Sequence, residues 1–492
     1  MALRRTAAGP KGGAPELGPH QPGLEAAVLD RVRRVKRDWL DALTPIQLLA
    51  LCFVMAILVG TILLLLPFSV AAGQKPVSLI DALFTATSAV CVTGLIVVDT
   101  GAHFSPFGQG VILALIQFGG LGIMTASTFL FLALGQRSSL RNLILLRNEY
   151  TVTGFASAKA LIITVAGFTF VMESVGAVVL ANRFAAEMPV GPAIWHGIFH
   201  SVSAFCNAGF SLFSESFSGY RQDPTITLAV PLLIIIGGLG FPALIDLFHK
   251  VRARLRGTRM ALSLHAKIVF AASAALLALG TLAFFAFEGP RAQLRDAPMA
   301  EKIGAAWFQS ATTRTAGFNT IEFAEASEPA LLTTIVLMII GGSPGSTAGG
   351  IKITTFVVIL LVVIARLRGH ERVEIGKRTL PAAVITKALV VALLGVALIV
   401  VATLLLLITD GATAETGPKH GSFVSLLFEV VSAFGTVGLS MINAGTLTWM
   451  GKLIIICVMY LGRLGPLALA QMVLAADKPL KYRYPEEHLL VG

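Results

Sequence analysis

Four segments of the 492-residue chain share one pattern, in which small and hydroxyl-bearing residues lead to a glycine. The segments read Ser88-Ala-Val-Cys-Val-Thr-Gly94, Ser203-Ala-Phe-Cys-Asn-Ala-Gly209, Ala311-Thr-Thr-Arg-Thr-Ala-Gly317 and Ser432-Ala-Phe-Gly-Thr-Val-Gly438. Their final glycines are separated by 115, 108 and 121 residues, an even spacing that indicates tandem duplication. The chain is therefore expected to build one kind of structural unit four times.

A second glycine-rich element follows each segment in the same order. These elements begin at Gly119, Gly237, Gly341 and Leu461, which lie 25, 28, 24 and 23 residues after the four final glycines. Two elements that recur four times in one order are hard to obtain by chance. Close helix packing, which small residues favour in membranes, explains the double glycines at 119–122 and 237–240 equally well.

Each repeat has the same predicted anatomy. A long apolar helix (46–66, 158–182, 263–287, 382–408) precedes a short amphipathic segment (78–89, 192–204, 300–311, 421–433), and a second apolar helix follows (107–135, 226–249, 330–366, 450–474). About 12 helical residues rise about 18 Å, too little to cross a hydrocarbon core of about 30 Å. The predicted fold class is an all-α polytopic membrane protein with four tandem helix–pore-helix–loop–helix repeats around one pore, giving eight transmembrane helices and four half-helices.

Composition supports this class. Hydrophobic residues make up 55% of the chain and charged residues only 13%, well below the share of about 25% usual in soluble domains. The net charge of +11 comes from clusters in alternate connections, such as Arg137–Arg147 and Arg366–Arg378. That is the positive-inside pattern of a multi-pass protein, and it argues against a nucleic-acid-binding surface. Both termini are expected in the cytoplasm.

The predicted domain boundaries follow the repeats. Repeats one to four span 41–135, 136–250, 251–368 and 369–476. Residues 1–40 are expected to be a disordered, basic N-terminus, because they are rich in Gly, Pro and Ala without periodicity, and 477–492 a cytoplasmic tail. Cys52, Cys91, Cys206 and Cys457 lack paired metal-ligand spacing, so free thiols are expected, with neither a disulfide framework nor a metal site. No cofactor is expected in this chain.

The glycine loops have a cation-binding chemistry. Irregular backbone at membrane depth is tolerated where it is buried in protein or lines a water-filled cavity, so the four loops are expected to converge on one axis. The half-helices point their partially negative C-terminal ends toward the membrane centre, and loop carbonyls can replace the hydration shell of a cation. The predicted filter residues are Val92, Thr93, Gly94, Asn207, Ala208, Gly209, Thr315, Ala316, Gly317, Thr436, Val437 and Gly438.

The third repeat carries an interruption. Five glycines and a proline in the segment 341–350 cannot continue a regular helix, and the apolar flanks put the break at membrane depth, where a loop under the filter could obstruct the path. A phosphate-binding loop is disfavoured, because Gly-Lys-Ser/Thr and a preceding strand are absent. The predicted gate residues are Gly341, Gly342, Ser343, Pro344, Gly345, Ser346, Thr347, Ala348, Gly349, Gly350, Lys352 and Arg463.

Several other charges call for partners or roles. Arg463 could bond the carbonyls freed by the broken helix, or repel cations at a gate. Arg314 is expected to pair behind the filter, with Glu429 or another acid, whereas Glu173 has no identifiable partner in the sequence. The acidic residues of the outer connections could form a cation-attracting vestibule or be ordinary solvated charges: Asp81, Asp99, Glu187, Glu215, Asp223, Glu288, Asp296, Glu322, Glu325 and Glu328.

From about residue 40 to the end, the chain resembles the superfamily of Trk, Ktr and HKT potassium transporters, and KtrB-type membrane subunits in particular. The resemblance rests on the four filter segments, the glycine-rich break and Gly462-Arg-Leu-Gly-Pro466. It implies potassium bound at the filter carbonyls, a gating loop at 341–350 and a gate arginine at Arg463. It further implies plasma-membrane potassium uptake, in many members activated by sodium, by a lipid-embedded homodimer. A cytoplasmic nucleotide-binding regulatory subunit, forming a KtrA/TrkA-like ring, is the implied partner.

Other functions remain open from the residues alone. The resemblance relates serine at the first filter position to sodium transport, so Gly94 favours potassium over sodium. An ion-coupled transporter of a small solute also uses broken helices, but usually in inverted repeats with sites at the midplane. An enzyme is not expected, because no Ser/His/Asp, His-Glu-x-x-His or paired-carboxylate arrangement is found.

Overall fold

The computed structural model describes residues 45–135, 158–291, 293–376, 378–411 and 422–465. The predicted N-terminus 1–40, the basic cluster 137–147 and the tail 477–492 lie outside them. Within the first two predicted repeats the helices are α2 (Pro45–Leu64), α3 (Leu79–Val90), α4 (Thr100–His103), α5 (Pro106–Gly135), α7 (Ala158–Phe184), α8 (Val190–Phe205), α9 (Pro224–Leu239) and α10 (Phe241–Leu255). Within the last two they are α11 (Leu264–Glu288), α12 (Met299–Thr312), α13 (Glu328–Ile339), α14 (Ile353–Leu367), α15 (Ala382–Asp410), α16 (Ser422–Gly435) and α17 (Trp449–Leu464).

Short elements complete the connections. One-turn 3-10 helices occur at Pro67–Ser69, Ser218–Tyr220, Phe323–Glu325 and Ala444–Thr446. The described residues also contain one antiparallel hairpin between α14 and α15, formed by β1 (Glu374–Ile375) and β2 (Arg378–Thr379), with Glu374 opposite Thr379. Strand structure is therefore confined to this small connection in the described part of the chain.

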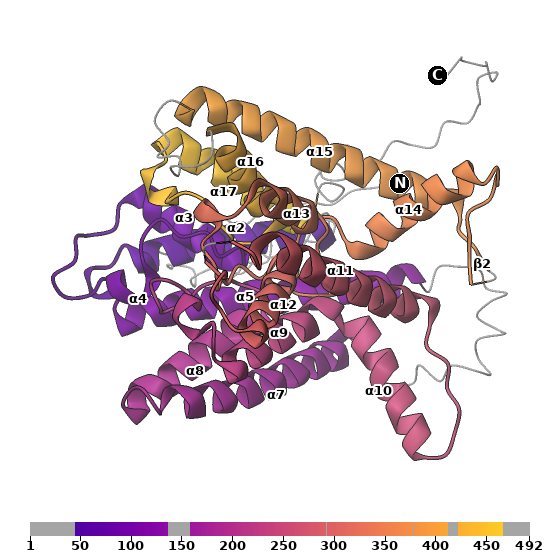
Figure 1. Ribbon diagram of the computed structural model, residues 1–492, viewed down its shortest axis with the longest axis horizontal. Helices are drawn as coiled ribbons and strands as arrows, with labels where there is room; N and C mark the ends of the chain where they lie inside the picture. Colours follow the sequence, from indigo (N-terminus) through magenta and orange to yellow (C-terminus); the bar gives the residue numbers. More distant parts are fainter. Residues whose placement is uncertain (1–44, 136–157, 292, 377, 412–421, 466–492) are drawn as a thin grey trace, which may run out of the picture. The chain divides into compact units, whose positions relative to one another are not determined.

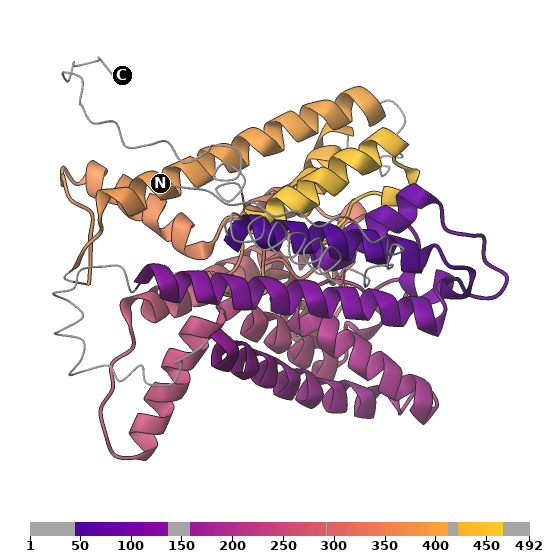
Figure 2. The same ribbon diagram turned by 180° about the vertical axis from the view of Figure 1, so that it is seen from behind.

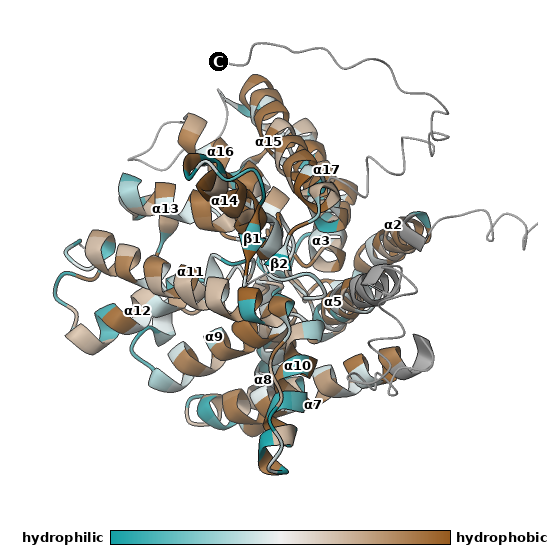
Figure 3. Ribbon diagram, turned by 90° about the vertical axis from the view of Figure 1, so that its right-hand side faces the viewer, coloured by the Kyte–Doolittle hydropathy of each residue, from teal (hydrophilic) through white to brown (hydrophobic). Residues whose placement is uncertain are grey.

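The apolar helices confirm an all-α polytopic membrane protein. Five described helices are long and apolar enough to cross a membrane: α2, α5, α7, α11 and α15. Their large apolar side chains face outward, as at Phe170 (71% exposed), Leu393 (70%) and Ile408 (72%), which suits contact with lipid acyl chains. In Figure 3, α15 and its neighbour α14 are coloured mainly hydrophobic. The remaining spans are interrupted or reach the edge of the described residues, so the count of eight crossings stays a prediction.

The repeats place a short helix against a long one. α7 packs along α8, α11 along α12, and α15 along α16, and Figures 1 and 2 show α15 beside α16 and α17 from both sides. The short helices α3, α8, α12 and α16 have 12 to 16 residues, and their C-terminal halves are buried. The core is therefore formed where these short helices end, and the long helices surround it.

The second helices of the repeats differ from one another. α5 continues for 30 residues. α9 ends at Leu239, and α10 begins after Gly240, whose φ is +82°; the two helices are bent by 100° relative to each other. The prediction of one helix over 226–249 is therefore wrong. In the third repeat, residues 340–352 separate α13 from α14, as the glycines and proline predicted.

Candidate functional site

The four loops that follow the short helices share an unusual backbone. In each loop the final glycine has a positive φ: +91° at Gly94, +71° at Gly209, +83° at Gly317 and +91° at Gly438. The residue two positions earlier also has a positive φ: +55° at Val92, +60° at Asn207, +70° at Thr315 and +49° at Thr436. Among described non-glycine residues, only Ser216 shares this conformation. Such strain costs on the order of 1–3 kcal/mol per residue and persists where the surroundings enforce it.

The four glycines meet in a closed ring. A Cβ added to each glycine would collide with the carbonyl oxygen of the residue before the next glycine around the ring. The added Cβ would lie 2.4 Å from Ala208 O at Gly94 and 2.9 Å from Ala316 O at Gly209. It would lie 2.4 Å from Val437 O at Gly317 and 2.2 Å from Thr93 O at Gly438. The fourth loop therefore returns to the first, and four carbonyl-bearing segments enclose one axis.

Hydrogen bonds hold the amide groups of these loops away from the ring. The N–H groups of Thr93, Ala208 and Val437 donate to carbonyls near the ends of their own short helices, at 2.8, 2.7 and 2.8 Å. In the third repeat, Ala316 N donates to Thr312 O at 2.9 Å. Because the amides are satisfied within each repeat, the loop carbonyls are left as the polar groups able to coordinate a cation.

The second glycine motif brings a helix behind each loop. A Cβ on Gly119 would lie 1.9 Å from Val90 O, one on Gly237 2.0 Å from Phe205 O, and one on Gly462 2.1 Å from Phe434 O. Each of these carbonyls belongs to the residue four positions before a ring glycine. Close packing therefore explains these three glycines, and the third repeat departs from the pattern because its helix is broken there.

The loop 341–350 is bonded to the break between α9 and α10. Ser343 N donates to Gly238 O at 3.0 Å, and Thr347 N donates to Gly237 O at 3.2 Å. In return, Phe241 N donates to Gly345 O at 3.0 Å. Two interrupted helices thus satisfy each other's exposed backbone groups, which is required at membrane depth.

The predicted gate cations both hold this loop. Arg463, 3% exposed in the last turn of α17, donates through Nη1 to Thr347 O at 2.5 Å and through Nη2 to Gly119 O at 3.1 Å. Lys352 Nζ donates to Ala348 O at 2.6 Å. On the ring side, a Cβ on Gly349 would lie 2.1 Å from the Oγ1 of Thr436. The loop therefore lies between Arg463 and the ring.

Two other buried charges have partners that the sequence did not reveal. Arg314 donates to Ser273, at 3.2 Å to its Oγ and 3.4 Å to its carbonyl, so the predicted pairing with Glu429 is wrong. Glu173 accepts from Gln117 Nε2 at 3.1 Å and contacts Cys206 Sγ at 3.6 Å. Cys206 precedes a ring glycine by three positions and Gln117 precedes Gly119 by two, which is the only sequence signal that could have indicated this cluster.

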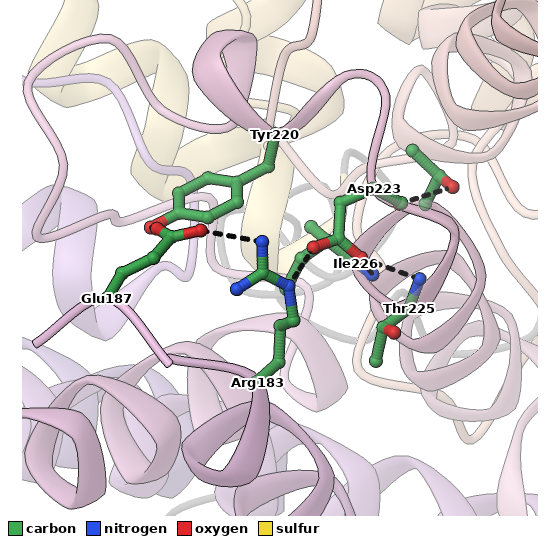
Figure 4. Close-up of polar contacts among 7 residues, drawn as sticks. Arg183, Glu187, Tyr220, Asp223, Thr225 and Ile226 are labelled. Atoms are coloured by element: carbon green, nitrogen blue, oxygen red, sulfur yellow. Dashed lines mark hydrogen bonds and ion pairs between the residues drawn. The ribbon is translucent and has the colours of Figure 1, made fainter. Parts of the chain in front are cut away.

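Much of the predicted outer acidity is already paired. Figure 4 shows Arg183 between Glu187, at 2.6 Å, and Asp223, with Tyr220 donating to Glu187 at 2.8 Å. Hydrogen bonds from Tyr220 and then Arg183 lower the pKa of Glu187. Elsewhere Lys452 pairs with Asp81 at 2.8 Å and Glu288 accepts from Ser327. These acids stabilise outer connections, which weakens the interpretation of a freely charged vestibule.

Comparison with known proteins gives the family. The model of the family described as "TrkH: Cation transport protein" matches residues 41–479. The Ktr system potassium uptake protein B of Bacillus subtilis is 38% identical over 450 residues, covering 91% of this chain and 97% of that protein. Its counterpart in Vibrio alginolyticus is 39% identical over 458 residues, covering 93% and 97%. The potassium/sodium uptake protein NtpJ of Enterococcus hirae is 38% identical over 454 residues, covering 92% and 98%.

A solved structure supports the same fold. The crystal structure of the potassium transporter TrkH from Vibrio parahaemolyticus matches with a TM-score of 0.64 at 21% identity, covering 86% of this chain and 84% of that one. At this identity the match bears on the fold, while the family match and the three relatives span most of the chain. The protein is therefore a membrane transporter and not an enzyme, and it belongs to the TrkH family of cation transport proteins.

Proposed function

We propose that this protein takes up potassium through a channel-like pore, whose selectivity filter is the ring of loop carbonyls around Gly94, Gly209, Gly317 and Gly438. The observation that carries the proposal is the closure of that ring, in which each glycine lies against a carbonyl of the next loop. Carbonyl oxygens replace the hydration shell of potassium, and a Cβ at any of the four positions would intrude among them. The relatives named above are potassium uptake proteins, which supports the choice of ion.

Gating is assigned to the loop 341–350. Its backbone is hydrogen-bonded to the break between α9 and α10, and also to the side chains of Arg463 and Lys352. A segment bonded to three helices and lying under the ring would close the path until these bonds rearrange. We further propose a homodimer in the plasma membrane, with both termini cytoplasmic, activation by sodium and control by a cytoplasmic nucleotide-binding regulatory subunit.

Sodium is the second candidate ion, because one relative is a potassium/sodium uptake protein. The filter test is Gly94→Ser in purified protein reconstituted into liposomes, with potassium and sodium uptake measured separately. The serine Cβ would lie 2.4 Å from Ala208 O at a φ of +91°, so the ring must deform. Sodium uptake is expected to rise relative to potassium uptake.

The matched control is Gly110→Ser in α5, where an added Cβ meets nothing within 4 Å. That variant should keep the wild-type selectivity. An unchanged ratio of the two ions in Gly94→Ser would contradict the filter assignment. Saturable uptake of an organic solute without potassium flux would instead favour a coupled solute transporter.

The gate test is deletion of residues 341–350. Potassium flux should rise in protein that is still folded and inserted, and unaltered or lower flux would refute the gate. Flux with and without sodium, and with and without the regulatory subunit and its nucleotides, tests the proposed activation and control. Cross-linking in native membranes tests the homodimer.

A further inference from the structure

The outer end of a filter loop is the part beyond its ring glycine, and three such ends are hydrogen-bonded to a side chain deep in their own short helix. In the second repeat, Leu212 N donates to Nε2 of His200 at 3.2 Å. In the fourth repeat, Met441 N donates to Oε1 of Glu429 at 2.9 Å. Each donor lies twelve residues after its acceptor and three residues after its ring glycine.

The third repeat makes the same bond with a different side chain. Two backbone N–H groups and the Thr320 hydroxyl face one end of the Gln309 amide, so that end is assigned as the oxygen. It accepts from the N–H groups of Thr320 at 2.9 Å and Ile321 at 3.1 Å, and from Thr320 Oγ1 at 3.1 Å. Ile321 again lies twelve residues after its partner, but four after Gly317, because Gln309 stands one position nearer its ring glycine than His200 and Glu429 do. We call His200, Gln309 and Glu429 the outer anchors.

The outer anchors are fully enclosed, so their bonds cannot be exchanged for water. His200 is 0% exposed, and Gln309 and Glu429 are each 1% exposed. His200 Nε2 is the acceptor for Leu212, so its Nδ1 carries the proton and donates to His196 O at 2.8 Å. A histidine, a glutamine and a glutamate thus accept the same kind of backbone donor in three successive repeats, although they share no side-chain charge.

Within the residues that the structure describes, the first repeat shows no such bond. Thr85 occupies the position nine residues before Gly94, where His200 and Glu429 stand relative to their own glycines. Its side chain is shorter, and its buried Oγ1 has no hydrogen-bond partner among the described residues. The first loop is therefore the one whose outer end is not held from its own short helix.

We propose that the outer anchors are positioning residues for ion selectivity, which hold three of the four filter loops at the spacing that potassium requires. The proposal rests on the filter function proposed above. An anchored loop keeps its carbonyls at a fixed distance from the axis, and a loop that has lost its anchor can close around the smaller sodium ion. Because a buried N–H left without an acceptor is costly, loss of an anchor should displace the loop and not leave it in place.

The test compares Glu429→Leu, which removes the acceptor, with Glu429→Gln, which keeps an oxygen for Met441 N without the charge. Thr85→Val in the first repeat is the matched control. Potassium and sodium uptake are measured in liposomes, and hydrogen exchange of residues 439–442 is followed in the same preparations. Gln309→Leu and Gln309→Glu repeat the comparison in the third repeat, in case Glu429→Leu does not fold.

In Glu429→Leu, the ratio of potassium to sodium uptake should fall by roughly tenfold, which corresponds to about 1.4 kcal/mol, and the Met441 amide should exchange faster. Glu429→Gln and Thr85→Val should keep most of the wild-type ratio. A Glu429→Leu variant with reduced uptake of both ions at an unchanged ratio would overturn the proposal, because that result describes a merely structural residue.

The two proposals fail in different ways. Wild-type protein that carries no potassium overturns the filter function, and the exchange of the Met441 amide then still decides whether Glu429 holds the loop. Wild-type potassium selectivity together with an unchanged ratio and unchanged exchange in Glu429→Leu leaves the filter standing and refutes the outer anchors.

Discussion

The same four residues, Gly-Gly-Leu-Gly, occur at 119–122 in α5 and at 237–240 at the end of α9, and the backbone differs between the two places. α5 continues through the first copy without a break, whereas α9 ends within the second. Both copies pack a glycine against a carbonyl at the end of a short helix, as Gly119 does at Val90 and Gly237 at Phe205. The glycines alone therefore do not decide whether the helix continues.

The residues that follow make the difference. Met124 stands two positions after the first copy, and Pro242 two positions after the second. In a continuous helix Pro242 could not donate to Gly238 O, and its ring would clash with that carbonyl. Instead, Gly238 O accepts from Ser343 N of the loop 341–350 at 3.0 Å. The break is thus tolerated because another repeat supplies the missing partner, and the pair of breaks forms one unit.

The largest expected effect comes from moving the proline. Met124→Pro would remove the bond to Gly120 O in α5, and no described loop donates a hydrogen bond to that carbonyl. The free energy of unfolding should fall by about 3 kcal/mol or more. Thermal unfolding in detergent measures this, with Met124→Leu as the volume-conserving control. A proline variant as stable as its control would show that the loop is not what permits the second break.

Arg463→Gln tests a side chain that touches both regions, since it bonds Gly119 of the continuous helix and Thr347 of the loop. Removing its charged donors should lower the free energy of unfolding by about 2 kcal/mol and release the loop. Potassium flux should increase, because the closed position of the loop loses a bond. Lower flux at full expression would argue that Arg463 supports the open pore.

Alanine substitutions at the last glycines of the two tetrapeptides should differ by a smaller amount in their effect on the free energy of unfolding. Gly240→Ala places a Cβ 2.7 Å from Pro344 O at a φ of +82°, and should destabilise by about 1–2 kcal/mol. Gly122→Ala meets only Phe53, at 3.4 Å, and should be neutral or stabilise the helix by up to about 1 kcal/mol. Equal shifts in unfolding temperature for the two variants would contradict the comparison.

Pro242→Ala should have the smallest effect. The bonds from Ser343, Thr347 and Phe241 remain available, so the bend should persist and stability should change by less than about 1 kcal/mol. Distances between spin labels on Leu228 and Leu255, both exposed, would report the angle between α9 and α10. A straightened helix would assign the break to the proline alone.

The repeated spacing was enough to predict that the four glycine loops meet, and the glycines and proline of 341–350 were enough to predict the interruption in the third repeat. Four glycines at matching positions must occupy matching places if the units are duplicates, and the structure brings Gly94, Gly209, Gly317 and Gly438 together. The bend at Gly240 could not be predicted in this way, because its tetrapeptide is identical to one inside a straight helix and a proline also fits the start of a new helix.

The hydrogen-bond partners of buried polar side chains could not be predicted from the sequence, for a different reason. Arg314 and Ser273 are 41 residues apart, and nothing in their neighbouring residues marks them as a pair. The outer anchors are three residue types that do one task, so a search for identical residues across the repeats passes over them. Similar backbone geometry was inherited by the repeats, while the side chains that support it diverged.

Arg463 shows what a single chain permits that four identical subunits would not. In a fourfold-symmetric pore, an arginine in this last helical turn would appear four times and put four positive charges around the ion path. Mutual repulsion and repulsion of the ion would add together in a low-dielectric interior. Because the repeats are covalently joined and have diverged, only the fourth carries this charge. A charge at this place can thus be changed in one repeat while the other three repeats keep their uncharged residues.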